Sequence, residues 1–99
     1  MIEHRDARYY EQANAHIELS NSHLQQAIPG QVLSAMIHAT SRFGAWAWAA
    51  SSASAEDYKA RHDQALNGYL DECRRQFEDH FNEHARDFDR LLGRQKTAG

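Results

Sequence analysis

Apolar residues recur at steps of three and four along most of the chain, which is the spacing of one face of an α-helix. The first such run extends from about Asp6 to Ile28, and Asp6 is a residue type that caps helix N-termini. We expect Pro29-Gly30 to end this helix, because Pro disfavours the helical conformation in the residue before it and Gly accepts positive φ. The apolar positions of the run are Tyr10, Ala13, Ile17, Leu24 and Ile28.

The second run, from about Gln31 to Ser51, has a much wider apolar face. At about 100° per residue, its apolar side chains fill an arc of about 200°. A helix at a protein surface has a narrower stripe, so we expect neighbours to cover this helix on two sides. The residues expected to be almost fully buried are Met36, Phe43 and Ala47, and those expected to face water are His38 and Arg42.

Trp46 and Trp48 lie at opposite edges of this arc, because two residues are separated by about 200° on a helix. One neighbouring helix therefore cannot bury both indoles. The pair could line a ligand pocket, but core and interface packing is the more frequent use of such side chains and is the interpretation favoured here. Trp48 is accordingly a candidate interface residue.

A third run, from about Ala55 to Leu92, keeps one helical phase throughout and follows a capping residue, Ser54. Its internal helix breaker, Gly68, lies opposite the apolar stripe, which favours one long helix over a kink at Asn67-Gly68 that would create a fourth helix. The sequence therefore predicts an all-α protein, a small bundle of three helices. We expect a single domain over residues 1–99, with a frayed tail at 94–99.

The predicted lengths of these helices do not match. At 1.5 Å per residue, the first two would be about 30–35 Å long and an unbroken third about 57 Å, so about 25 Å of the third would extend beyond the bundle. Uncovered apolar surface of that length marks an interaction site, and two-fold dimers are the most frequent oligomers. We therefore expect a homodimer, unless the chain folds back at Gly68. The candidate interface residues are Trp48, Phe81, Phe88, Leu91 and Leu92.

Composition narrows the classes of function. The 99 residues carry 11 Lys and Arg against 14 Asp and Glu, and the basic residues alternate with acidic ones, so no basic patch indicates a nucleic-acid partner. The longest uncharged run, 43–50, is far shorter than the ~20 residues of a membrane span. Cys73 is the single cysteine, which excludes an intramolecular disulfide, and we expect it to be a buried, inert thiol in a cytoplasmic protein.

Several short stretches of the first two runs also carry a family resemblance. They are Ala15-His16-Ile17-Glu18-Leu19-Ser20-Asn21, Ser34-Ala35-Met36-Ile37, Arg42-Phe43-Gly44-Ala45 and Ala49-Ala50-Ser51-Ser52. In these stretches the chain resembles a family of small bacterial proteins, domain of unknown function 3144. The resemblance implies a compact all-helical protein without assigned chemistry, and it transfers no catalytic or binding residue.

The segment His80-Phe81-Asn82-Glu83-His84 is the sharpest candidate for chemistry, because it matches the H-x-x-E-H pattern of one class of zinc peptidases. The spacing puts both imidazoles on one side of a helix, close enough to share a metal ion. A peptidase also needs a third ligand and a substrate cleft, for which a helical bundle of this size has little room. We therefore expect His80 and His84 to be packing histidines, and we assign no catalytic residue and no cofactor.

Two classes of function remain. The leading hypothesis is a non-enzymatic protein that self-associates, or binds an unidentified protein partner, through the aromatic face of its third helix. The alternative is a protein that binds a small ligand or a metal ion through His80, Glu83 and His84, with a metallopeptidase as the third possibility.

Overall fold

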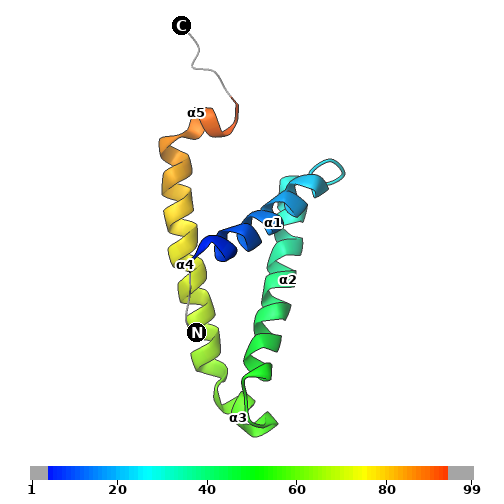
Figure 1. Ribbon diagram of the computed structural model, residues 1–99, viewed down its shortest axis with the longest axis vertical. Helices are drawn as coiled ribbons and strands as arrows, with labels where there is room; N and C mark the ends of the chain where they lie inside the picture. The colour runs from blue at the N-terminus through cyan, green and yellow to red at the C-terminus, as the bar shows by residue number, and fades with distance from the viewer. Residues whose placement is uncertain (1–4, 94–99) are drawn as a thin grey trace, which may run out of the picture. The chain divides into compact units, whose positions relative to one another are not determined.

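The computed structural model describes residues 5–93, which are helical over most of their length and include no strand (Figure 1). The prediction of an all-α protein with three long helices is confirmed. The predicted frayed tail at 94–99 lies outside the described residues. The helices are α1 (Ala7–His23), α2 (Pro29–Ala50), α3 (Ala55–Ala60), α4 (His62–Arg86) and α5 (Phe88–Leu91).

The internal contacts divide the chain into two units, Met1–Ala47 and Trp48–Gly99. The first contains α1 and most of α2. The second contains the last residues of α2 together with α3, α4 and α5. The single domain expected over residues 1–99 stays a prediction.

The connection between α1 and α2 begins earlier than the sequence pattern indicates. Asp6 caps α1 as expected, since its Oδ1 accepts a hydrogen bond of 2.9 Å from the backbone N–H of Tyr9. The helix ends at His23 rather than Ile28 and closes with tight turns in which residues 24–26 donate to carbonyls three residues back. The prediction that Pro29-Gly30 ends a helix is wrong: the pair begins α2. Pro suits the first position of a helix because a backbone N–H there has no intrahelical partner, so its absence in Pro costs no hydrogen bond.

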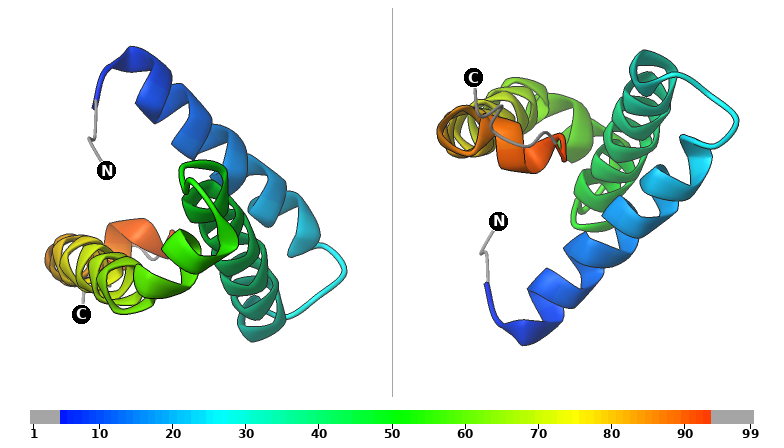
Figure 2. Two further views of the ribbon diagram at one scale, coloured as in Figure 1. Left: turned by 90° about the horizontal axis from the view of Figure 1, so that it is seen from below. Right: turned by 90° about the horizontal axis from the view of Figure 1, so that it is seen from above.

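The third predicted helix is interrupted at two residues that are not helix breakers. Arg61 separates α3 from α4, and Asp87 separates α4 from α5. The alternative of a kink at Asn67-Gly68 is wrong, because α4 passes through both residues, and its successive turns lie over one another in the end-on views of Figure 2. At 1.5 Å per residue, α4 is about 37 Å long and α2 about 33 Å, so the large difference in helix length from which the overhang of about 25 Å was predicted is not present.

Gly68 therefore occupies an ordinary helical position. Its φ is not positive, and a Cβ built on it would meet no atom within 4 Å. Gly68→Ala should raise the free energy of unfolding by about 1 kcal/mol, because Ala loses less backbone entropy on folding and fits the helix without strain. Urea denaturation measures this change, and a lower free energy of unfolding in the variant would show that residue 68 is a hinge after all.

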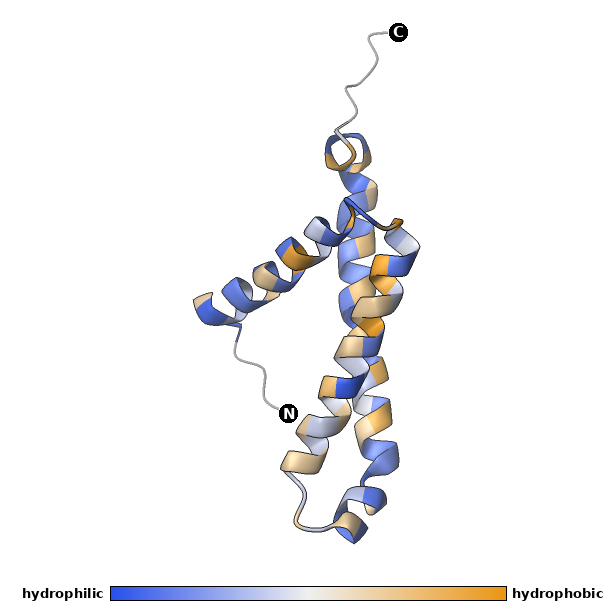
Figure 3. Ribbon diagram, turned by 90° about the vertical axis from the view of Figure 1, so that its right-hand side faces the viewer, coloured by the Kyte–Doolittle hydropathy of each residue, from blue (hydrophilic) through white to orange (hydrophobic). Residues whose placement is uncertain are grey.

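Burial is the largest departure from the sequence-based expectation. Among residues 5–93, Val32 is the one buried hydrophobic side chain, with 6% of its surface exposed. The prediction that Met36, Phe43 and Ala47 are almost fully buried is wrong. Met36 and Ala47 are half-buried, and Phe43 is 67% exposed, on the helix that carries the longest apolar run (Figure 3). His38 and Arg42 are exposed as expected. A wide apolar arc shows which side chains favour burial but does not supply the partner that buries them.

Candidate functional site

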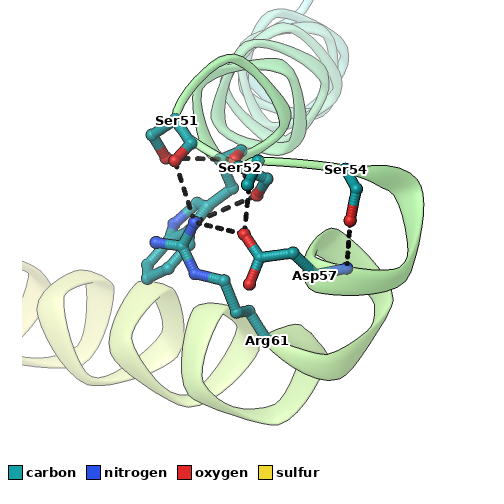
Figure 4. A network of polar contacts seen from close by, with 7 residues as sticks. Ser51, Ser52, Ser54, Asp57 and Arg61 are labelled. Atoms are coloured by element: carbon teal, nitrogen blue, oxygen red, sulfur yellow. Dashed lines mark hydrogen bonds and ion pairs between the residues drawn. The ribbon is translucent and has the colours of Figure 1, made fainter.

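The corner where α2 gives way to α3 and α4 is the most densely bonded part of the second unit (Figure 4). The guanidinium of Arg61 lies over the ring of Trp48, with Cζ 4.5 Å from the ring centroid. Nη1 of Arg61 donates to the Ser51 carbonyl at 3.2 Å and to Ser52 Oγ at 3.0 Å. It also lies 3.9 Å from Oδ2 of Asp57. One side chain thus joins the end of α2 to the residue between α3 and α4.

A local cap completes this corner. Ser54 Oγ accepts a hydrogen bond of 3.1 Å from the N–H of Asp57, and Asp57 Oδ2 accepts one of 2.9 Å from the N–H of Ala53. This reciprocal pair resembles a capping box and satisfies N–H groups that have no intrahelical partner. The predicted cap at Ser54 is confirmed, and it sets where α3 begins.

The corner is held together by contacts among residues of the second unit. Every partner of the Arg61 guanidinium named above belongs to the chain itself, and the ring of Trp48, a predicted interface residue, is half-buried with Arg61 over it. The role of Trp48 as an interface residue stays a prediction. Within the second unit, Arg61 holds Ser51 and Ser52, which follow α2, close to the start of α4.

The apolar stripe of α4 consists of Leu66, Leu70, Cys73, Phe77 and Phe81, at steps of four, three, four and four residues. All five residues are exposed, Phe77 at 66% and Phe81 at 61%, and the rings of these two lie 5.7 Å apart between centroids. The expectation that Cys73 is buried is therefore wrong, because its side chain is exposed on α4. The described part of the second unit thus exposes an apolar stripe that extends over about four helical turns of α4.

The end of the described chain adds a short apolar cluster. Phe88, Leu91 and Leu92 are each about half exposed, at 49–51%. Arg90 donates to Oδ2 of Asp87 at 2.6 Å across the break between α4 and α5, and this hydrogen bond and the charge of Asp87 raise the pKa of the Arg90 guanidinium. The predicted interface candidates, apart from Trp48, are therefore all exposed. They are Phe81, Phe88, Leu91 and Leu92.

His80 and His84 lie on the same side of α4, as their spacing predicts, with their rings stacked at 6.5 Å between centroids. Both are exposed within the described chain, and the expectation that they are packing histidines stays a prediction. Glu83 is exposed as well. Among residues 5–93, no group of three or more His, Cys, Asp or Glu side chains is placed to hold a metal ion.

The first unit also presents apolar side chains on its surface. Phe43 and Trp46 form an exposed pair on α2 with ring centroids 5.5 Å apart. Leu33 and Ile37 are exposed on the same helix. Sequence periodicity identified these residues as apolar helix positions, but it did not predict that they would lie on the surface. Across residues 5–93, no helix has the combination of length and apolar character that crossing a membrane requires.

Comparison with known proteins identifies a family for the chain but no chemistry. No curated protein and no solved structure matches the chain. Residues 9–85, which include α2, α3 and almost all of α1 and α4, match the family described as "Protein of unknown function (DUF3144)". Since this match covers most of the sequence, the chain belongs to that family.

Proposed function

We propose that this protein is a non-enzymatic, self-associating helical protein, in which a second copy of the chain covers the apolar stripe of α4. The proposal rests on one observation, the contrast between a single buried hydrophobic residue and the many exposed ones in residues 5–93. The exposed large hydrophobic residues of the second unit include Leu66, Leu70, Phe77, Phe81, Phe88, Leu91 and Leu92.

Energetics make this contrast significant. Ordering the backbone of one residue costs about 1–2 kcal/mol at 25 °C. Burying one side chain such as Val32 contributes only about 1.5–3 kcal/mol, so the burial described here cannot stabilise five helices. A stable folded state therefore needs to cover more apolar surface. The α4 stripe is the longest candidate in the second unit, and it runs for about 22 Å from Leu66 to Phe81.

A second copy is the partner that this stripe fits best. In a two-fold dimer the same patch faces itself, so the length and apolar character of the two surfaces match automatically. The steps between Leu66, Leu70, Cys73 and Phe77 are four, three and four residues, which is the spacing of the contact positions in a two-stranded coiled coil. The single exposed thiol, Cys73, suits a reducing compartment, so we place the protein in the cytoplasm.

Sedimentation equilibrium on the chain purified without an affinity tag, combined with metal analysis, tests this function. We expect a mass of twice 11.4 kDa at micromolar concentration, partial dissociation on dilution, and no stoichiometric metal. A mass of 11.4 kDa throughout would contradict self-association. A tightly bound metal ion that is lost in the variant His80→Ala, His84→Ala would instead favour the metal-binding alternative through His80, Glu83 and His84.

A further inference from the structure

The two ends of the α4 stripe carry different polar groups, a carboxylate at one end and an imidazole at the other. Continuing the four-three spacing by one step in each direction leads to Asp63 before Leu66 and to His80 after Phe77. We call the six residues in this phase the α4 seam: Asp63, Leu66, Leu70, Cys73, Phe77 and His80. The seam thus begins with a carboxylate, ends with an imidazole and is apolar between them.

Both ionisable ends of the seam are open to a partner. The side chain of Asp63 is 93% exposed, and its Oδ1 lies 2.9 Å from Nδ1 of its neighbour His62. His80 is also exposed and stacks on His84 one turn later. Neither the carboxylate nor the imidazole is buried within the described chain, so each can meet a group from a second molecule.

A parallel pair of α4 helices would place like residues opposite each other. Asp63 would face Asp63 of the partner subunit, and His80 would face His80 of the partner subunit. Two carboxylates in the same layer repel, and like charges at matched helix positions are unfavourable. The parallel arrangement therefore gives the apolar seam an unfavourable layer at its acidic end.

An antiparallel pair removes this conflict in one register. When Leu70 lies opposite Cys73 of the partner subunit, Leu66 lies opposite Phe77 of the partner subunit, and the core layers are apolar throughout. The next layer outward brings Asp63 opposite His80 of the partner subunit. Beside that layer, His62 flanks Glu83 of the partner subunit, a second pairing of imidazole with carboxylate.

The neighbouring antiparallel register is less favourable. Sliding one helix by a heptad places Leu70 opposite His80 of the partner subunit. It also places Asp63 opposite Asp87 of the partner subunit. Polar groups would then lie against the leucines, and two carboxylates would meet at the end. The pairing of carboxylate with imidazole therefore favours the first register over this one.

We propose that two copies of this chain associate through an antiparallel pair of α4 helices, with Leu66 facing Phe77 and Asp63 facing His80 across the two-fold axis. This inference rests on the proposed self-association and specifies its geometry. It predicts that each apolar and each ionic contact occurs twice in the dimer, because the interface is related to itself by symmetry.

Disulfide trapping in the full chain distinguishes the two orientations. In a Cys73→Ser background, Asn67→Cys and Arg74→Cys place thiols beside the seam, where residue 67 of one copy meets residue 74 of the other only in the antiparallel register. Mixing these two variants under mild oxidation should give a covalent heterodimer as the main product, whereas each variant alone should give little. Leu66→Cys in the same background is the parallel reporter, because residue 66 meets itself only in a parallel pair.

The outcomes separate this inference from the proposed function. Efficient trapping of Leu66→Cys with itself, or no trapping in the Asn67→Cys and Arg74→Cys mixture although the chain is dimeric by mass, would overturn the antiparallel register and leave self-association standing. A monomeric mass would overturn both. The expected result is trapping in the mixture alone.

A charge exchange provides a second readout that does not depend on thiol chemistry. Asp63→Lys should weaken dimerisation by about tenfold, because two hydrogen bonds between carboxylate and imidazole are lost. Adding His80→Asp to that variant should restore the dissociation constant to within about threefold of the original. Asp71→Lys, an acidic residue off the seam, is the matched control and should change dimerisation little. Failure of the exchanged pair to recover affinity would argue against the assigned Asp63–His80 contact.

Discussion

Replacing Leu70 and Phe77 together with Asp is expected to weaken self-association by about 1,000-fold and to leave the chain monomeric at micromolar concentration. Both residues are exposed on α4, and Phe77 is 66% exposed. A central apolar residue of an interface contributes about 2 kcal/mol or more, so the loss of two such residues costs at least about 4 kcal/mol. Losing about 4 kcal/mol corresponds to roughly three orders of magnitude in the dissociation constant.

Matched substitutions on the opposite side of α4 provide the control. Arg75→Asp and Glu78→Lys alter exposed residues that lie outside the apolar stripe, so dimerisation should change by less than about threefold. Circular dichroism at a fixed concentration shows whether each variant keeps its helices. A double variant that remains a dimer with the original dissociation constant would exclude the α4 stripe from the interface.

Arg61→Ala is expected to lower the free energy of unfolding by about 2 kcal/mol, even though Arg61 is a partly exposed residue. Its side chain is 28% exposed and makes two hydrogen bonds and a contact with the Trp48 ring. A hydrogen bond from a charged donor contributes about 1.5–3 kcal/mol and a cation–π contact about 0.5–1 kcal/mol, and partial exposure reduces the total. Urea denaturation at constant protein concentration measures the loss.

Two further variants make this prediction specific. Arg61→Lys keeps the positive charge but loses the planar group that stacks on Trp48 while bonding to Ser51 and Ser52, so it should recover less than half of the lost stability. Arg75→Ala removes an exposed arginine that pairs with Glu72 on the same helix, and it should cost less than about 0.5 kcal/mol. Equal effects for Arg61→Ala and Arg75→Ala would show that the corner is not a stabilising element.

Local signals in the sequence were sufficient to predict the starts of α1 and α3. Asp6 and Ser54 were identified as caps because a capping side chain bonds to an N–H only three residues away, and both bonds are present. Pro29 was misassigned because the same residue type that stops one helix is also suited to begin the next. The breaks at Arg61 and Asp87 lacked a breaker residue, so nothing in their local sequence indicated them.

Contacts between distant residues could not be derived from periodicity. Arg61 and Trp48 are separated by a helix end, a Ser-rich turn and the six residues of α3, and only the path of the backbone brings guanidinium and indole together. Phe43 shows the related difficulty for burial. Its place on the apolar arc of α2 was identified correctly, but an apolar position becomes a buried one only when a partner is supplied, and Phe43 is exposed in this chain.

Isotope-filtered nuclear magnetic resonance on a mixture of labelled and unlabelled chains tests most directly whether a second copy covers α4. If a second copy covers α4, we expect intermolecular cross-peaks between the methyl groups of Leu66 and Leu70 in one molecule and the α4 helix of the other, including the ring of Phe77. Absence of every intermolecular cross-peak from these leucines, in a sample whose mass is 11.4 kDa, would contradict it.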